Sequence, residues 1–382
     1  MEREGRLAKM VGKVSLTLRL SLLVREFARL SGKTIDVRIG RTLAYKLLKR
    51  FKEEGEAGLA ELSRRPHHSP RRSAGPVEAA VLKVRKAHPA WGGRKISKAL
   101  EKKGFAAPAP STVTDIVRRS GAGLGQFGGG AQPFIRFEHA APNDLWQMDF
   151  KGHVLMADGA RLHPLTVLDD HSRFSVVIAA CGREDRETVK IPLIAAFRRF
   201  GLPLRMAMDN GPPWGDRGNQ PFTRFGVWLI EQGIFISHSR PCHPQTLGKD
   251  ERFHRTLKAE AMQETYECLT AAQAGLDAWR GVYNDERPHE AIGYAVPAER
   301  YSPSSRHWRD TPEPWFYSEG DEVRRVQKKG EASLFGHTVK ISKAFHGKDI
   351  AFRPAQDQRD GVYDAYFRHQ KIKTIDLTAS KE

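Results

Sequence analysis

Long apolar runs are missing from this sequence. No stretch of the 382 residues approaches the roughly 18 consecutive apolar residues that a membrane-spanning helix needs. The first ten residues are charged and do not resemble the apolar core of a secretory signal peptide. We therefore expect a cytoplasmic protein.

Cysteine is also scarce. The three cysteines, Cys181, Cys242 and Cys268, lie far apart in the sequence, and no two of them form a Cys-x-x-Cys pair. This spacing indicates neither a disulfide framework nor a cysteine zinc site. We interpret the three thiols as packing residues.

The composition is that of a folded protein. Hydrophobic residues make up 40% of the chain and charged residues 28%, which is ordinary for globular proteins and too apolar for a disordered chain. With about 150 residues per domain, a chain of 382 residues is expected to form two or three domains.

Negative charge is scarce in the N-terminal part. Residues 1–140 contain 29 Lys and Arg but only 12 Asp and Glu, so they carry +17 of the net charge of +18. Such a region attracts polyanions, and no amphipathic anchor accompanies it that would favour a membrane surface. We expect DNA or RNA as the partner; the alternative is a basic surface without a ligand.

Residues 1–60 are predicted to form a helix-turn-helix DNA-binding domain. Two helical patterns flank residues 31–34, and the second has leucine and phenylalanine residues at spacings of three and four. Lys46, Lys49 and Arg50 on this second helix could contact phosphates, although a plain solvated helix would carry the same residues.

Two linkers are predicted around a second helical unit. In residues 61–75 prolines prevent a helix, so we expect an extended basic linker that can follow a DNA backbone. Residues 121–140 are glycine-rich and are expected to form a flexible linker. The candidate DNA-binding residues of the basic linker are Arg64, Arg65, Arg71 and Arg72.

Residues 76–120 are predicted to form a second helix-turn-helix domain. Helices are expected at residues 77–87 and 94–103, and a third after Ser111, which we interpret as its N-cap. The candidate DNA-binding residues here are Arg94, Lys95, Arg118 and Arg119.

An α/β domain is predicted over residues 141–296, because short apolar strands alternate there with helical patterns. The linker 297–318 contains several prolines, and residues 319–378 alternate apolar and polar positions as a small β-barrel does. We expect strands of the α/β domain at 145–150, 165–168, 174–180, 205–208 and 234–237, and helices at 187–200, at 222–232 and from residues 248 and 271.

Three carboxylates stand where this topology can bring them together. Asp149 lies inside the first strand, Asp209 just after the fourth, and Glu251 near the start of a helix. A carboxylate in an apolar strand is costly to bury unless a cation or a donor compensates it. Oxygen ligands and a phosphate substrate favour two Mg²⁺ or Mn²⁺ ions about 3.5 to 4 Å apart. We therefore predict these residues to be catalytic metal ligands.

Basic residues accompany Glu251. Arg255 and Lys258 follow it at i+4 and i+7 on one helix face, where they could press a DNA phosphate toward the metals. Arg255 could instead form only a surface ion pair. His243 and Lys249 precede the helix in a stretch expected to be mobile, and we predict that they contact DNA.

Other polar residues near these motifs are expected to be structural. We assign Asp169 and Asp170 to a hairpin turn. Asp250 points about 100° away from Glu251 around the helix and is expected to face solvent. We expect Tyr283, Asn284, Arg287 and His289 to brace the helix beside the core.

These motifs resemble the DDE transposases of bacterial insertion sequences, which carry a core similar to that of retroviral integrases. The resemblance extends over nearly the whole chain. Its most specific parts are His243 to Thr246 and the run from Glu251 to Leu257. The other matching stretches are residues 45–50, 63–66, 88–89, 91–92, 94–96, 146–150, 168–173, 209–211, 248–249, 283–284, 287–289 and 297–301.

The resemblance implies a multidomain α/β protein with a ribonuclease H-like core, in which helices flank a mixed five-stranded sheet. It also implies that Asp149, Asp209 and Glu251 are the metal ligands. They are separated by 60 and 42 positions, and the second interval is somewhat long for the family. We attribute the excess to the loop 212–218, since added loop length costs little.

The function implied by the resemblance is DNA transposition. Such a protein binds terminal inverted repeats, exposes 3′-hydroxyls at the transposon ends and joins them to target DNA by two-metal phosphodiester transfer. It would work in a bacterium, at the nucleoid, as at least a dimer on double-stranded DNA. The alternatives are a metal-dependent nuclease without strand transfer and a DNA-binding regulator with an inactive core.

Overall fold

The structure, a computed structural model, describes residues 46, 49–50, 53–55, 72–121, 138–215, 222–238, 248–355 and 360–378. The chain divides into two units, Met1–Arg72 and Ser73–Glu382. In the first unit the described residues between 46 and 54 are helical. Most of the predicted domain 1–60 and of the linkers 61–75 and 121–140 lies outside the described residues.

The second unit begins with three short helices, α4 (Gly75–Ala87), α5 (Gly93–Lys102) and α6 (Pro110–Arg119). They enclose a small apolar core that includes Val81, Trp91, Leu100 and Val113. The three predicted helices are confirmed. Ser111 as the N-cap of the third is wrong: Ala109 precedes the helix and Pro110 starts it, because proline already has a helical φ and needs no donor there.

A mixed sheet forms the centre of the α/β domain. Its strands run in the order β4-β3-β1-β5-β6, and the two-residue strand β2 extends the hairpin beside β3. β1 pairs antiparallel with β3 and parallel with β5, which pairs parallel with β6. The bounds are β1 Leu145–Phe150, β2 Val154–Leu155, β3 Arg161–Asp169, β4 Ser175–Cys181, β5 Arg205–Met208 and β6 Phe235–His238.

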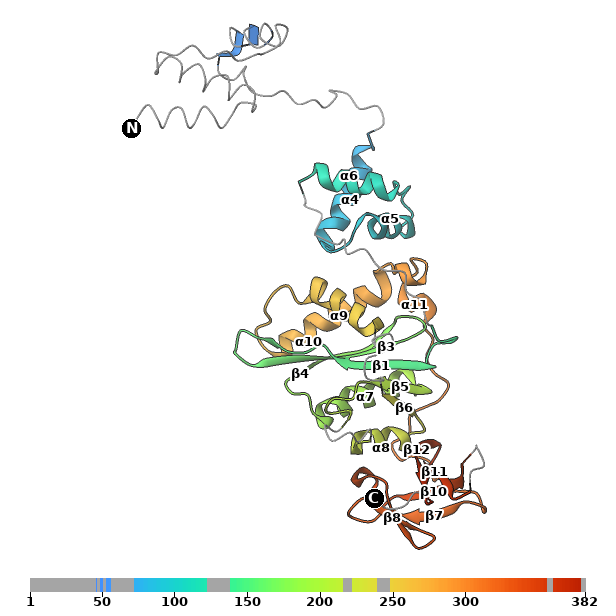
Figure 1. Cartoon of the computed structure of the whole chain (residues 1–382). Coiled ribbons are helices and arrows are strands. Elements are labelled where there is room, and N and C mark those ends of the chain that lie inside the picture. Colours follow the sequence, from blue (N-terminus) through green and yellow to red (C-terminus); the bar gives the residue numbers. More distant parts are fainter. Residues whose placement is uncertain are drawn as a thin grey trace, which may run out of the picture. The chain divides into compact units, whose positions relative to one another are not determined.

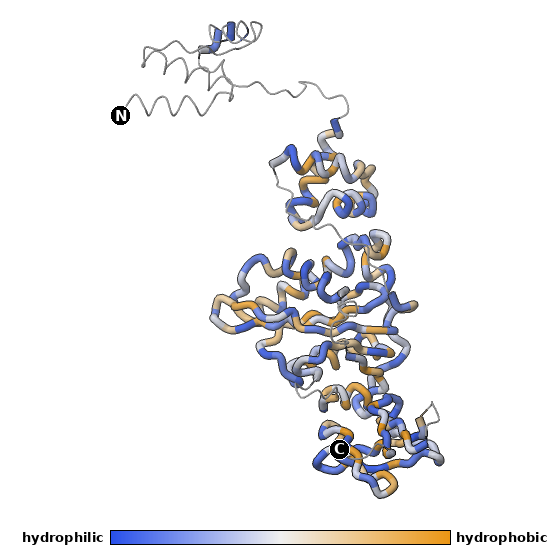
Figure 2. The backbone as a smooth tube through the Cα atoms, viewed as in Figure 1, coloured by the Kyte–Doolittle hydropathy of each residue, from blue (hydrophilic) through white to orange (hydrophobic). Residues whose placement is uncertain are grey.

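Helices cover both faces of this sheet (Figure 1). α7 (Arg186–Phe200) and α8 (Arg224–Glu231) lie on one face, and α9 (Gly248–Ala261) and α10 (Leu269–Gly281) on the other. Hydrophobic positions follow the strands between these layers in Figure 2. This order of strands, with helices on both faces, is that of a ribonuclease H-like core.

Strand alternation decides which helices each side chain of β1 meets. Trp146 and Met148 belong to the core cluster that contains residues of α7 and α8. Leu168, on β3, instead packs with Phe253 and Leu257 of α9. Because Asp149 alternates with Met148 along the strand, its side chain lies on the α9 face of the sheet.

The segment that follows α10 remains in contact with the α/β domain. It contains the π-helical turn η3 (Val282–Glu286), the 3-10 turn η4 (Glu290–Ile292) and the short helix α11 (Pro297–Arg300). Beyond them, the Tyr301 ring stacks on Phe174 with ring centroids 4.2 Å apart. Arg306 donates to the main-chain oxygens of Pro203 and Gly233. The predicted linker is therefore packed against the α/β domain where the structure describes it.

The C-terminal residues form a four-stranded antiparallel sheet, β12-β11-β10-β7, and a two-stranded ribbon of β8 and β9. Their β structure is confirmed. A closed barrel is not confirmed, because no strand pairing joins the ribbon to the sheet among residues 322–355 and 360–376. The bounds are β7 Glu322–Arg325, β8 Glu331–Leu334, β9 His337–Lys340, η5 (a 3-10 turn) Lys343–Phe345, β10 Asp349–Pro354, β11 Val362–Phe367 and β12 Gln370–Asp376.

Within the described ranges, none of the helices has the length and apolar character needed to cross a bilayer.

Candidate active site

Asp149 occupies the next-to-last position of β1. Burial, and then the negative charge of Asp209, raises the pKa of its carboxyl to about 7. One carboxyl oxygen accepts a 2.8 Å hydrogen bond from the Phe150 main-chain N–H. A carboxyl in this environment is poised between its neutral and charged forms at physiological pH.

Asp209 is the first residue after β5. Since β1 and β5 are parallel neighbours, their C-terminal ends meet at one edge of the sheet, and Asp209 comes near Asp149. Burial raises the pKa of Asp209, although the Gly211 N–H donates to its Oδ1 at 3.1 Å. Its main-chain oxygen lies 2.9 Å from Nδ1 of His238, at the end of β6.

Glu251 lies in the first turn of α9 but points away from these two residues. Its side chain is 75% exposed, and its nearest ion-pair partner is Arg255 at 3.9 Å. Among the described residues, no three His, Cys, Asp or Glu side chains converge in a way that could hold a metal ion. The structure thus brings Asp149 and Asp209 together and leaves Glu251 outside.

Asp250 does not face solvent, so that expectation is wrong. Its side chain is completely buried, and neither carboxyl oxygen has a hydrogen-bond partner among the described residues. The buried face of α9 carries Asp250, Phe253, His254 and Leu257, at helical spacings of three and four. The helix phase that buries Phe253 and Leu257 therefore turns Asp250 inward and Glu251 outward. Burial, then the charge of Asp149, raises the pKa of Asp250 well above its ordinary value.

A histidine missed by the sequence analysis lies next to Asp149. His254 on α9 is buried, and its Nδ1 is 3.9 Å from Asp149 Oδ2. Its Nε2 is 2.7 Å from the hydroxyl oxygen of Thr166, the residue that faces Asp149 across the β1–β3 pair. Burial lowers the pKa of His254 to about 4, so the ring is neutral. Its place in the run 251–257, three residues after Glu251, was the available signal.

Glu184 is a second missed residue. It lies between β4 and α7, and its carboxylate adds to the effect of burial in raising the pKa of both Asp149 and Asp209. Nδ1 of His163 lies 2.7 Å from Glu184 Oε1. No sequence motif marked it, because its proximity depends on where the β4–α7 loop folds.

The turn between β3 and β4 is built by the two adjacent aspartates, as predicted. Asp169 accepts hydrogen bonds from the main-chain N–H groups of Ser172 and Asn143 at 2.8 and 2.7 Å. Asp170 accepts from the Gln147 amide at 2.7 Å and from the Lys249 ammonium at 2.5 Å. Lys249 thereby attaches the start of α9 to this turn, and its side chain is only 20% exposed.

The predicted bracing role of the residues after α10 is confirmed. The Asn284 side chain accepts from the Ser175 N–H at 2.8 Å and donates to its main-chain oxygen at 3.1 Å. Arg287 donates to Glu260 at 3.0 Å. The buried rings of Tyr283 and His289 contact each other edge to face.

The other predicted DNA-binding residues are dispersed. Lys46 is exposed, Lys49 is exposed 3.9 Å from Glu53, and Arg50 is half-buried. Arg72 is exposed. Arg64, Arg65, Arg71 and His243 lie outside the described residues. Arg255 and Lys258 are exposed on α9.

In the α4–α6 unit, two of the four predicted residues turn toward the α/β domain. Arg94 contacts Glu290 at 3.1 Å, and burial lowers the pKa of Lys95 to about 8. On α6, Arg118 pairs with Asp115 at 2.9 Å and Arg119 with Glu78 at 2.8 Å. Arg118 and Arg119 therefore lie away from the contact between Arg94 and Glu290.

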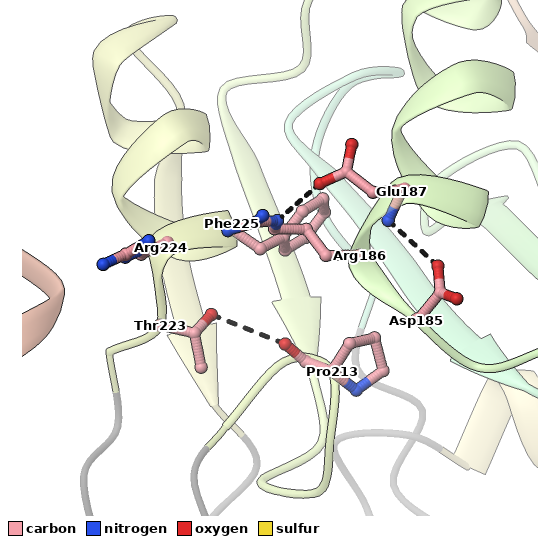
Figure 3. Close-up of a pocket in the computed structure, with 7 residues that line it drawn as sticks. All are labelled: Asp185, Arg186, Glu187, Pro213, Thr223, Arg224 and Phe225. Carbon is pink, nitrogen blue, oxygen red and sulfur yellow. Dashed lines mark hydrogen bonds and ion pairs between the residues drawn. The ribbon is translucent and has the colours of Figure 1, made fainter.

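A cavity of about 490 Å³ opens near this edge of the sheet (Figure 3). It lies between the first turns of α7 and α8 and the loop after β5, and Pro213 and Thr223 are hydrogen-bonded at its base. Its other lining residues are Asp185, Arg186, Glu187, Arg224 and Phe225. Because none of the three candidate carboxylates lines it, we do not assign the chemistry to this cavity.

Models of known families match most of the chain. Two models described as integrase core domain match residues 139–244 and 232–297. The C-terminal domain of IS481 family transposases matches residues 321–382. A homeodomain-like domain matches residues 43–117, across parts of both predicted helix-turn-helix units. The protein therefore has an integrase catalytic core of ribonuclease H-like fold with a helix-turn-helix-like region before it.

More specifically, the chain is similar to the insertion-sequence transposases that carry a retroviral-integrase-like core, as the sequence motifs predicted. It is 30% identical over 173 residues to an uncharacterized 31.7 kDa protein of insertion element IS407 from Burkholderia multivorans. It is 34% identical over 160 residues to an uncharacterized 39.2 kDa protein of IS476 from Xanthomonas euvesicatoria. These matches cover 45% and 41% of this chain, but only 60% and 44% of the relatives.

Among solved structures, the catalytic core domain of BIV integrase aligns with 41% of this chain and 92% of its own, at 24% identity and a TM-score of 0.32. The family models and the strand order identify the core, because a TM-score this low does not define a fold.

Proposed function

We propose that this protein is a DDE-type DNA transposase in which Asp149, Asp209 and Glu251 carry metal-dependent phosphodiester transfer. The observation that supports this most directly is the pair Asp149 and Asp209, at adjacent ends of parallel strands. Both are buried enough for the pKa of each carboxyl to be raised. Two half-buried carboxyls that repel each other bind a divalent cation well, because the cation compensates both.

The residues present fit a hard divalent cation. Asp149 and Asp209 supply oxygen ligands, and cysteine sulfur, which would favour softer metals, does not accompany them in the motifs. Two bound Mg²⁺ or Mn²⁺ ions would supply activation of the attacking oxygen and stabilisation of the leaving one. The protein's own part is to hold the carboxylates at one sheet edge and to orient the DNA.

Glu251 is the third ligand in this proposal. Its pair with Arg255 is long and largely exposed, and such pairs contribute little. A change of the Glu251 side-chain rotamer therefore costs little. Glu251 lies three residues, or slightly less than one helical turn, before His254, whose Nδ1 is 3.9 Å from Asp149 Oδ2. We expect Glu251 to reorient toward Asp149 when metal and DNA are present.

The helix-turn-helix-like region and the basic charge of residues 1–140 support DNA binding. We propose that this region binds the terminal inverted repeats, while Arg255 and Lys258 on α9 hold the scissile strand. We also propose that the C-terminal strands form a small barrel. Because two transposon ends must be joined, we expect at least a dimer on DNA.

The test is a joining assay with labelled end-DNA, a target plasmid and Mg²⁺. We expect cleavage that exposes 3′-hydroxyls, followed by joined product. Asp149→Asn, Asp209→Asn and Glu251→Gln should each lower joining by at least a hundredfold while leaving the binding of end-DNA intact. Asp285→Asn, an exposed carboxylate on η3, is the matched control and should keep wild-type activity.

The outcome of this assay also distinguishes the transposase from the alternative functions. Cleavage without joined product would favour a nuclease. Wild-type joining by Asp209→Asn would contradict the mechanism, and specific DNA binding with no cleavage in Mg²⁺ or Mn²⁺ would favour a regulator with an inactive core.

A further inference from the structure

The buried contact between α9 and the sheet fixes how His254 presents its ring to Asp149. The Thr166 hydroxyl is the shared partner: it donates to the main-chain oxygen of Asp149 at 3.0 Å and lies 2.7 Å from His254 Nε2. Thr166 and His254 are both buried, so water does not replace either contact easily.

Proton counting then assigns the ring tautomer. A threonine hydroxyl has one proton to donate. If that proton is used for the Asp149 main-chain oxygen, the hydroxyl can only accept from His254, so Nε2 must carry the ring hydrogen. The opposite tautomer would give up one of the two bonds at a buried site, which is costly.

The consequence lies at the other ring nitrogen. In the Nε2–H tautomer, Nδ1 has a lone pair and no hydrogen, and it stands 3.9 Å from Asp149 Oδ2. This distance is too long for a direct hydrogen bond. A nitrogen lone pair and a carboxylate oxygen that face each other can share a cation between them, or a water molecule that donates to both.

We propose that His254 is a nitrogen ligand of the cation held by Asp149, so that this metal position has a mixed oxygen and nitrogen donor set. The inference rests on the proposed function, because it assumes that Asp149 binds metal. Metal–ligand bonds of about 2.1 Å allow two donors up to about 4.2 Å apart to share one ion, and 3.9 Å falls within that limit. Thr166 has the supporting role, since it sets the tautomer and the ring orientation, as outer partners of metal-binding histidines do.

A nitrogen ligand changes the preferred metal. A nitrogen donor favours first-row transition ions over Mg²⁺, which prefers oxygen donors, and Mn²⁺ is the weakest-binding of these transition ions. We therefore expect the protein to bind Mn²⁺ more tightly than Mg²⁺, with His254 responsible for a large part of the difference.

The direct test is electron spin-echo spectroscopy of the full-length protein with one equivalent of Mn²⁺. We expect a nitrogen coupling to the ion that changes when histidine alone is labelled with ¹⁵N. This measurement uses the wild-type chain, so it does not depend on whether a variant folds. A Mn²⁺ signal that is lost in Asp149→Asn but shows no histidine nitrogen in the wild type would overturn the inference and leave the proposed function standing.

Substitutions separate the two ring nitrogens. In His254→Gln the side-chain amide can still donate to Thr166 but offers no atom in place of Nδ1. We expect its Mn²⁺ affinity, measured by calorimetry, to fall on the order of tenfold, with a smaller loss for Mg²⁺. His307→Gln, an exposed histidine outside the site, should bind both ions as the wild type does.

Two further results would contradict the ligand role of His254. Equal losses for Mn²⁺ and Mg²⁺ in a folded His254→Gln variant would mean that the ring only supports packing, and would refute the ligand role. If the wild type binds neither ion, the proposed function fails together with this inference.

Discussion

At the scale of single residues, the protonation of Asp149 can be measured through its effect on stability. Burial, and then the charge of Asp209, raises the pKa of Asp149 to about 7, above the value of about 4 in an unfolded chain. Between these values the folded protein holds an extra proton, so the contribution of Asp149 to the free energy of unfolding falls as pH rises. Above pH 7 the folded protein bears the full free-energy cost of holding Asp149 in its charged form.

We therefore predict that Asp149→Asn stabilises the metal-free protein. At pH 8 the gain in unfolding free energy should be on the order of 2 kcal/mol, less than three pKa units would give, because the side chain keeps some solvent contact. At pH 5 the gain should be smaller. Urea unfolding followed by tryptophan fluorescence measures both, and Asp285→Asn serves as the pH-independent control. An equal gain at the two pH values would show that Asp149 has an ordinary pKa.

How far the sequence predicts the site differs from residue to residue. Asp149 and Asp209 were predictable as neighbours, because an apolar strand and a turn after a parallel strand fix where each lies. The roles of Glu251 and Asp250 depend on the rotation of α9, which is set by the packing of Phe253 and Leu257 against the sheet. His254 could not be assigned, since its role needs Thr166, 88 positions away in the chain.

At the scale of elements, one buried acidic side chain links α9 to α10 and to the residue that follows η3. Glu260 accepts from Arg287 at 3.0 Å and from the Trp279 indole at 3.1 Å, and both members of the ion pair are less than 10% exposed. Removing one partner of a buried pair leaves an uncompensated charge, whereas replacing both does not. The orientation of α9, and with it of His254, depends on this contact.

We predict that Glu260→Gln lowers the free energy of unfolding by about 3 kcal/mol, and that Glu260→Gln combined with Arg287→Met is less destabilised than Glu260→Gln alone. Glu313→Gln, which breaks an exposed pair with Arg309, should have no measurable effect. Thermal and urea unfolding test all three. If the double variant loses as much unfolding free energy as Glu260→Gln alone, the unpaired charge of Arg287 is not the cause of the destabilisation.

The elements themselves were mostly predictable, because their apolar patterns are strong. β1 and β5 begin and end where predicted, and the helices of the α/β domain differ by one or two residues at their ends. The C-terminal strands were also expected, but barrel closure depends on pairings between distant strands, which local alternation does not determine. The prolines after α11 predict a linker because they prevent regular structure, yet Tyr301 and Arg306 pack this segment against the core.

At the scale of the whole molecule, basic charge is concentrated at the N-terminal end. Residues 1–72 form a unit of their own and contain 18 Lys and Arg against 8 Asp and Glu, so removing them takes away +10 of the net charge of +18. DNA binding by such residues releases counterions, and the observed affinity then falls steeply with salt. The remaining unit keeps the α4–α6 helices, whose Arg94 and Lys95 turn toward the α/β domain.

We predict that a chain of residues 73–382 binds end-DNA more weakly than the full chain and with a shallower dependence on salt. Each lost phosphate contact should reduce the slope of log K against log salt by about 0.9, so a loss of several units is expected if residues 1–72 contact the DNA backbone. Fluorescence anisotropy titrations at salt concentrations between about 50 and 200 mM measure this slope for each chain. Arg118→Gln with Arg119→Gln, made in the truncated chain, should reduce the remaining slope further because both lie on α6, away from the contact with the α/β domain. Equal slopes for the full and truncated chains would mean that the N-terminal charge does not contact DNA, and the binding would have to be assigned to α6 and α9.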